Sequence, residues 1–288
     1  MDSELLATQL KKHFGFSGVL RLQDLMNLAP RLGISSITPY APASKERGAF
    51  GKLGQHIEIL FKEDDWDGSQ EHSIGHELRE IIGKVASELD PNFVDAEGNE
   101  LEDIADSFSA ALFMDKESFY DDMISTGFDP ITLRNHYHKS YIGIMGRMAT
   151  ILRFKTPREF IWVSVLESDS TAPAGYFRAK CFHRSPRYIP KVRYQIPNFL
   201  FPKRGQLVPI LGNMKKAFES KRSVYIRKLN GLDFWNQYSL SVIIRPVIWA
   251  GKVAKLLVIA LPESDAYKLR PQLISAKPLI TDESFQVL

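Results

Sequence analysis

Apolar residues recur at helical spacing over residues 72–89. They form one stripe, which consists of Ile74, Leu78, Ile81, Ile82, Val85 and Leu89. The opposite side of the helix carries His72, His76, Glu80 and Gly83. The pattern predicts a helix with one face on a core and the other on a cleft or solvent, and Gly83 would let another element approach the polar side closely.

A second amphipathic helix is predicted over residues 102–114. Its apolar stripe consists of Leu101, Ile104, Ala105, Phe108 and Leu112. Glu102, Asp106 and Ser109 are aligned along one flank of this stripe, whereas Asp103 points nearly away from the core. A carboxylate on that flank can reach a neighbouring helix.

The pattern changes after residue 155, where short runs rich in β-branched and aromatic residues predict strands. These strands cover residues 159–166, 175–182, 223–227, 239–247 and 253–261. A helix is predicted at 207–220, and Ala250-Gly251 supplies a hairpin turn between the last two strands. We therefore expect the α+β class, and the layout of this second half resembles a GAF-type sensor domain.

The first predicted helix contains the sequence HELRE at residues 76–80, which is one residue away from the zinc-protease motif H-E-x-x-H. In that motif two ligands four residues apart bind one metal ion, and the glutamate between them accepts a proton from water. His76 and Glu80 keep the ligand spacing, and Glu77 keeps the position of the general base. Because a carboxylate oxygen is an acceptable ligand, the pair predicts a site for zinc or manganese.

Neighbouring residues complete this candidate metal site. On the second helix Glu102 is the better placed carboxylate for a third ligand, and Asp106 can accept the free imidazole N–H of a ligating histidine. A second register pairs His72 with His76, which restores two histidines but puts Ser73 where the base belongs. The acidic residues of the second helix can instead complement a helix dipole.

Taken together, these segments resemble the ImmA/IrrE family of metallo-endopeptidases. The order and spacing match over about residues 20–150, through segments at 28–34, 48–51, 55–61, 76–80 and 102–114. Two positions depart from the family's pattern: Glu80 replaces the second histidine, and Asp115 replaces the usual proline.

The resemblance implies a domain organisation. A zincin-like peptidase domain would cover residues 1–125, a small helix-turn-helix-like helical subdomain 126–155, and the GAF-like sensor domain 156–288. The helices of the middle part are expected at 128–134 and 140–148, and they either contact DNA or pack against the peptidase domain.

The resemblance also implies a function. His76, Glu80 and Glu102 would be the metal ligands and Glu77 the general base of an endopeptidase. Its substrate would be a helix-turn-helix transcriptional repressor, whose cleavage releases genes of a stress response or a mobile element. The alternative is a catalytically degenerate relative that binds a regulator or nucleic acid without hydrolysis.

Composition places the protein among globular chains. Its 288 residues are 44% hydrophobic and 25% charged, which suffices for two modest domains with their own cores. A single cysteine, Cys181, excludes an internal disulfide and fits a reducing compartment. The first residues contain no long apolar run, so we expect a cytoplasmic protein without a membrane span.

The net charge of +3 is unevenly distributed, because acidic residues concentrate between Glu63 and Asp129 while the second half is basic. Aromatic residues alternate there with cations, of which the strongest candidates for contacting nucleic acid are Arg184, Arg187, Lys191, Arg193, Lys203 and Arg204. A solvated charged face explains the same pattern. The signal for the second domain is thus predicted to be a small molecule or a nucleic acid.

Overall fold

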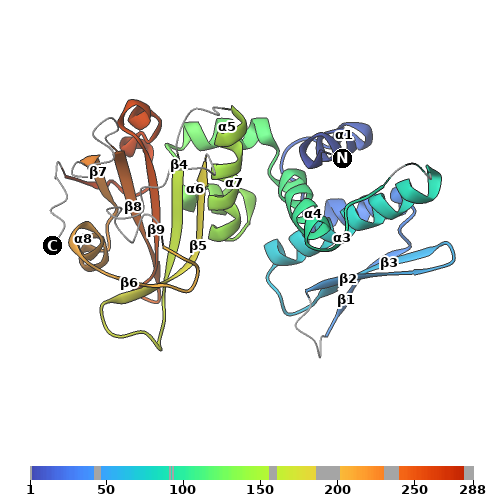
Figure 1. The fold of residues 1–288 in the computed structure, drawn as a ribbon, viewed down its shortest axis with the longest axis horizontal. Coiled ribbons are helices and arrows are strands. Elements are labelled where there is room, and N and C mark those ends of the chain that lie inside the picture. Colours follow the sequence, from blue (N-terminus) through green and yellow to red (C-terminus); the bar gives the residue numbers. More distant parts are fainter. Residues whose placement is uncertain are drawn as a thin grey trace. The chain divides into compact units, whose positions relative to one another are not determined.

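The computed structural model of the chain describes residues 2–41, 47–90, 92, 94–155, 161–185, 202–229 and 240–281. It divides into two compact units. The first unit consists of residues 1–119 and 137–140, and the second of residues 120–136 and 141–288. Both units combine helices with a mixed sheet (Figure 1), so the expected α+β class is confirmed. The predicted domain boundaries at 125 and 155 stay predictions.

The first unit begins with helices and continues with a small sheet. Its elements are α1 (Ser3–Phe14), α2 (Leu22–Leu28), the 3₁₀ helix η1 (Ala29–Leu32), β1 (Ser36–Tyr40), β2 (Gly48–Leu53), β3 (His56–Lys62), α3 (Asp67–Leu89) and α4 (Gly98–Phe113). The strand order is β1-β3-β2, with β1 parallel and β2 antiparallel to β3. Helix α3 packs on β2 and β3, and α4 packs on α3.

The predicted apolar stripe of α3 forms part of the core of this unit. Ile74, Leu78 and Ile81 are at most 3% exposed and pack with apolar residues of β3 and α4. Leu89 is an exception, because it is the last residue of the helix and is 81% exposed. The prediction that Leu89 faces the core was therefore wrong.

Glycines on α3 permit close approach of other segments. A Cβ atom at Gly83 would lie 1.8 Å from Asp95 Oδ2, which confirms the expected close contact. Asp95 accepts hydrogen bonds of 2.9 and 2.6 Å from the guanidinium of Arg79. On another side, a Cβ atom at Gly75 would lie 2.7 Å from Ser109 Oγ of α4. Small residues at this crossing thus let α3 and α4 approach each other closely.

Residues 137–140 rejoin the first unit after a short excursion into the second. Lys139 Nζ lies 2.5 Å from Glu71 Oε2 of α3, and both residues are buried. The same ammonium lies 3.7 Å from the centroid of the Phe113 ring, at the end of α4. Burial lowers the pKa of Lys139 to about 8, even though the Glu71 carboxylate favours the charged form. This ion pair therefore ties the 137–140 segment to both long helices.

The second unit is built on a seven-stranded sheet of order β10-β7-β8-β9-β4-β5-β6. Its helices are α5 (Lys116–Ser125, which begins in the first unit), α6 (Pro130–Tyr137), α7 (Tyr141–Lys155), α8 (Gly212–Ser220) and the 3₁₀ helices η3 (Glu263–Lys268) and η4 (Pro271–Leu273). Its strands are β4 (Ile161–Ser168), β5 (Tyr176–Ser185), β6 (Leu207–Pro209), β7 (Val224–Leu229), β8 (Leu240–Trp249), β9 (Lys252–Pro262) and β10 (Leu279–Thr281).

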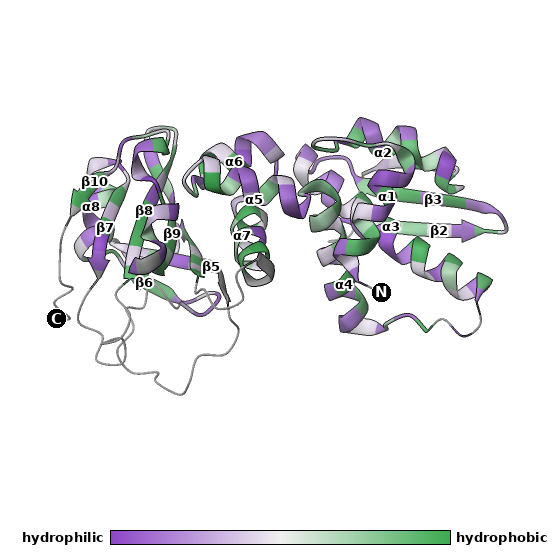
Figure 2. Cartoon of the chain, turned by 90° about the horizontal axis from the view of Figure 1, so that it is seen from above, coloured by the Kyte–Doolittle hydropathy of each residue, from purple (hydrophilic) through white to green (hydrophobic). Residues whose placement is uncertain are grey.

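Helices cover this sheet. Helix α7 packs on β4 and β5, whereas α8 packs on β7 and β8 and contributes Met214 and Ala217 to a core cluster with Trp162 (Figure 1). The first six residues of β4 are buried in succession, as expected for a strand covered on both faces. In Figure 2 the strands of this sheet carry green, apolar stretches beside purple ones.

Most elements predicted for the second unit are confirmed. Ala250 and Gly251 have φ angles of 46° and 75° and join β8 to β9 in the expected two-residue hairpin. The helix predicted at 207–220 was partly wrong, because residues 207–209 pair with β5 and the helix begins at Gly212. Pro209 explains this, since proline fixes φ, lacks an N–H and disfavours helical backbone at the preceding residue.

The two helices predicted at 128–134 and 140–148 are present as α6 and α7. Thr156 and Pro157, at the predicted domain boundary, lie outside the described residues. Within the described ranges, no helix combines the length and the apolar character needed to cross a bilayer.

Candidate metal centre

Three predicted ligands lie together where α3 and α4 face each other. His76 Nε2 is 3.2 Å from Glu80 Oε1 and 3.3 Å from Glu102 Oε2. One ligand atom from each residue lies within 4.8 Å of the other two. The helical spacing of His76 and Glu80 places both on one face of α3, and the close helix crossing brings Glu102 of α4 to them.

The ring of His76 is oriented by Asp106. Its Nδ1 lies 2.9 Å from Asp106 Oδ1, so Nε2 is directed at the two glutamates. The hydrogen bond to Asp106 raises the pKa of His76, and burial opposes that shift. Hydrogen bonds with two histidines hold the pKa of the Asp106 carboxyl well below its usual range. The bond with His72 has the larger effect and the bond with His76 the smaller one. Asp106 therefore has the geometry expected of a carboxylate that orients a ligating histidine.

His72 is held away from this cluster. Its Nε2 lies 3.2 Å from Asp106 Oδ1, and its Nδ1 lies 3.1 Å from Ser109 Oγ. Ser109 also donates a hydrogen bond of 2.9 Å to the backbone carbonyl of His72. Both ring nitrogens of His72 thus have partners. Sequence reasoning placed Ser109 on the same flank as Asp106 but did not predict its contact with His72.

Glu77 lies on the side of α3 that faces β2. Its side chain is half-buried, and a Cβ atom added to Gly48 of β2 would lie 2.9 Å from Glu77 Oε1. Its charge is close enough to His76 to favour the protonated form of that histidine. Because β2 is an edge strand of the β1-β3-β2 sheet, the Glu77 carboxylate lies beside a sheet edge.

The donor set fits a divalent metal ion. One imidazole nitrogen and two carboxylate oxygens are ligands that zinc and manganese accept, and three protein ligands are typical of catalytic zinc sites. The side chains are graded in exposure: His76 is 15%, Glu80 23% and Glu102 64% exposed. The cluster is thus open to solvent on the side of Glu102.

The other predicted sites receive less support. Arg187, Lys191 and Arg193 lie outside the described residues, whereas Lys203 and Arg204 are exposed in the turn before β6. Arg184 lies in β5, paired with β4.

Cys181 is a buried residue of β5. Burial raises the pKa of its thiol to about 12. It is therefore poorly suited to act as a nucleophile.

No protein-family model matches the sequence, and a search of curated proteins finds no match. The fold is similar to that of a solved structure described as a Mycobacterium tuberculosis transcriptional regulator, with a TM-score of 0.60 and 13% sequence identity. The alignment covers 97% of this chain and 83% of that chain. At this identity the similarity shows a shared fold and assigns no role to any residue.

Proposed function

We propose that the first unit is a zincin-like, metal-dependent endopeptidase of the ImmA/IrrE type. The observation that carries the proposal is the convergence of His76, Glu80 and Glu102, with Asp106 on the far nitrogen of the histidine. These contacts join positions on two helices, so the H-E-x-x-E sequence alone does not produce them.

His76, Glu80 and Glu102 would hold the ion, zinc or manganese. Such an ion supplies Lewis acidity that polarises a scissile carbonyl and makes water more acidic. Glu77 then acts as general base, taking a proton from the attacking water and returning it to the leaving amine. Asp106 keeps the His76 ring in the tautomer that leaves Nε2 free for the ion.

We further propose that the substrate is a helix-turn-helix transcriptional repressor and that the second unit is a GAF-like sensor domain. The name of the structural neighbour, a transcriptional regulator, supports a role in transcription. The seven-stranded sheet with helices packed on it supports the sensor domain. Cleavage of added repressors by the full chain, with and without small-molecule or nucleic-acid ligands, tests both parts.

A second candidate function is binding of the same regulator without hydrolysis. Glu80 in place of a histidine favours it, because a second carboxylate makes the ligand set harder and less selective for zinc. If the metal-loaded wild-type protein bound the repressor without cleaving it, this function would be identified.

The ligand register predicts a difference between the two histidines. We expect His76→Ala to lower zinc affinity at least about tenfold, whereas His72→Ala lowers it less, because the ring nitrogens of His72 lie against Asp106 and Ser109 rather than in the three-residue cluster. Competition with a chromophoric chelator, on full-length variants, measures both affinities. Equal losses in the two variants would instead place His72 among the ligands.

A further inference from the structure

Arg79 of α3 forms a buried ion pair that the proposed chemistry does not use. Its guanidinium donates hydrogen bonds of 2.9 and 2.6 Å to the two carboxylate oxygens of Asp95. The side chain of Arg79 is 1% exposed and that of Asp95 is 18% exposed. A guanidinium that bonds both oxygens fixes the orientation of the carboxylate as well as its distance. The pair therefore holds Asp95 in one place relative to α3.

This ion pair connects the helix of two proposed metal ligands to the segment that leads to the third. Arg79 directly precedes Glu80 and follows His76 by three residues. Asp95 lies between α3 and α4, seven residues before Glu102. The contact therefore shortens the free connection between Glu80 and Glu102 to the residues that follow Asp95.

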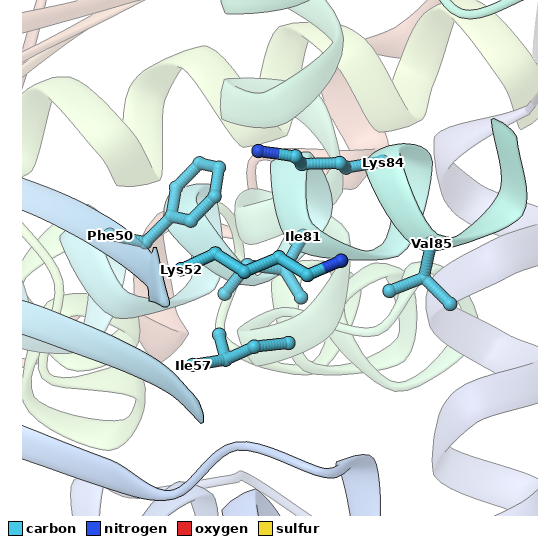
Figure 3. A pocket seen from close by; sticks show the side chains of 6 residues that line it. All are labelled: Phe50, Lys52, Ile57, Ile81, Lys84 and Val85. Atoms are coloured by element: carbon cyan, nitrogen blue, oxygen red, sulfur yellow. The ribbon is translucent and has the colours of Figure 1, made fainter. Parts of the chain in front are cut away.

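Helix α3 is a fixed base for this contact. Ile81 and Val85 belong to one apolar cluster with Phe50 and Ile57 of the sheet. Figure 3 shows these four side chains gathered between α3 and the sheet. Because the other side of α3 is packed in this way, a shift at the ion pair moves the connection to α4 rather than α3 itself.

The start of α4, which carries Glu102, is weakly held by its own sequence. The side chain of the N-cap residue Glu97 accepts no hydrogen bond from the described residues of the first turn. The first buried residue of the helix is Ala105, and the contact of Ser3 with the Ile104 carbonyl, at 3.0 Å, also lies on the C-terminal side of Glu102. Helix ends without a side-chain cap leave backbone N–H groups unsatisfied and fray readily. The ion pair anchors the chain on the N-terminal side.

Gly83 leaves the room that the ion pair occupies. A Cβ atom at this position would lie 1.8 Å from Asp95 Oδ2 and 2.5 Å from Arg79 Nη1. A side chain at Gly83 must therefore displace the pair. Because alanine is the better helix former by about 1 kcal/mol, Gly83→Ala disturbs the ion pair without weakening α3.

We propose that Arg79 and Asp95 are positioning residues for Glu102, the third ligand of the metal centre. Neither of the two is itself a ligand. The pair anchors the connection on α3, so that α4 begins from a fixed point and the Glu102 carboxylate stays beside His76. Without the pair the start of α4 frays, and the carboxylate spends less time at the metal centre. The inference rests on the proposed function, because it takes Glu102 as a ligand.

The zinc affinity of the full-length protein, measured by chelator competition, tests this role. Arg79→Gln, Asp95→Asn and Gly83→Ala should each lower the affinity about tenfold, as is typical when a residue that orients a ligand is replaced. Charge alone predicts another pattern, because loss of the Arg79 cation raises the affinity for a metal cation and loss of the Asp95 anion lowers it. Losses in all three variants are therefore specific to positioning. Asp95→Asn and Gly83→Ala keep the test decisive if Arg79→Gln does not fold.

Further comparisons exclude a general loss of stability. Asp103→Asn, at an exposed position of α4, removes the same charge as Asp95→Asn and should change the affinity by less than about threefold. In a Glu102→Ala background, Asp95→Asn and Gly83→Ala should lower the affinity by less than about twofold further, because the ligand that the pair positions is gone. In the metal-free protein, amides of residues 98–105 should exchange hydrogen at least about threefold faster in both variants.

Three results would overturn the inference while leaving the metal centre in place. They are opposite effects of Arg79→Gln and Asp95→Asn, unchanged affinity in Asp95→Asn and Gly83→Ala, and an equal further loss in the Glu102→Ala background. A wild-type protein that binds metal, shows the predicted losses and cleaves nothing supports the role of the pair and contradicts only the peptidase function. A wild-type protein that binds neither zinc nor manganese overturns both.

Discussion

Replacing Glu77 with glutamine is expected to lower the rate of peptide cleavage at least about a hundredfold, while zinc affinity stays within about threefold of wild type. Glutamine has nearly the shape of glutamate but cannot take a proton. Glu77 lies outside the cluster of His76, Glu80 and Glu102, so its replacement leaves the ligands in place. Single-turnover kinetics with a peptide that the wild type cleaves measure the rate, and chelator competition measures the affinity.

The matched control is Glu63→Gln, a charge-neutralising change at an exposed residue after β3. It should leave both quantities unchanged. If Glu77→Gln cleaved at the wild-type rate, the general-base role would be wrong. If it lost metal together with activity, Glu77 would be a ligand rather than a base.

The second large effect concerns the buried pair of Lys139 and Glu71. Lys139→Ala is expected to lower the free energy of unfolding of the first unit by about 3–5 kcal/mol, because it leaves the Glu71 carboxylate buried without its cation. The cavity under the lost side chain, beside Phe113, adds to this cost. Hydrogen exchange of α3 and α4 peptides in increasing urea measures the unit on its own within the full chain.

Two further variants isolate the charge effect. Lys12→Ala, at an exposed position, should change stability by less than about 0.5 kcal/mol. The double variant Glu71→Leu with Lys139→Met should recover much of the loss, since no buried charge then stays unpaired. A single Lys139→Ala variant as stable as Lys12→Ala would show that the pair contributes nothing to holding residues 137–140.

Helical periodicity predicted much of the candidate site from sequence. The stripe through Ile74 and Leu78 fixed which side of α3 is buried, and this placed His76 and Glu80 on the open side. The flank position of Glu102 likewise predicted that it reaches α3. Such patterns are strong over long amphipathic helices, because burial of one face selects a single orientation.

Other features depend on tertiary contacts that no local pattern encodes. Lys139 and Glu71 are 68 residues apart and meet only because the chain returns to the first unit. The contact of His72 with Ser109 lies at the close crossing of α3 and α4, where Gly75 approaches Ser109, and neither helix pattern alone encodes it.

The central claim is that His76, Glu80 and Glu102 bind a catalytic metal ion. Elemental analysis of the full-length protein tests this claim most directly. The protein is loaded with zinc or manganese, dialysed and compared with Glu80→Ala and Glu102→Ala. The predicted result is near-stoichiometric metal in the wild type and a clear loss in both variants, since each removes one of three ligands. A wild-type protein that retains no metal after loading with either ion would contradict the peptidase assignment.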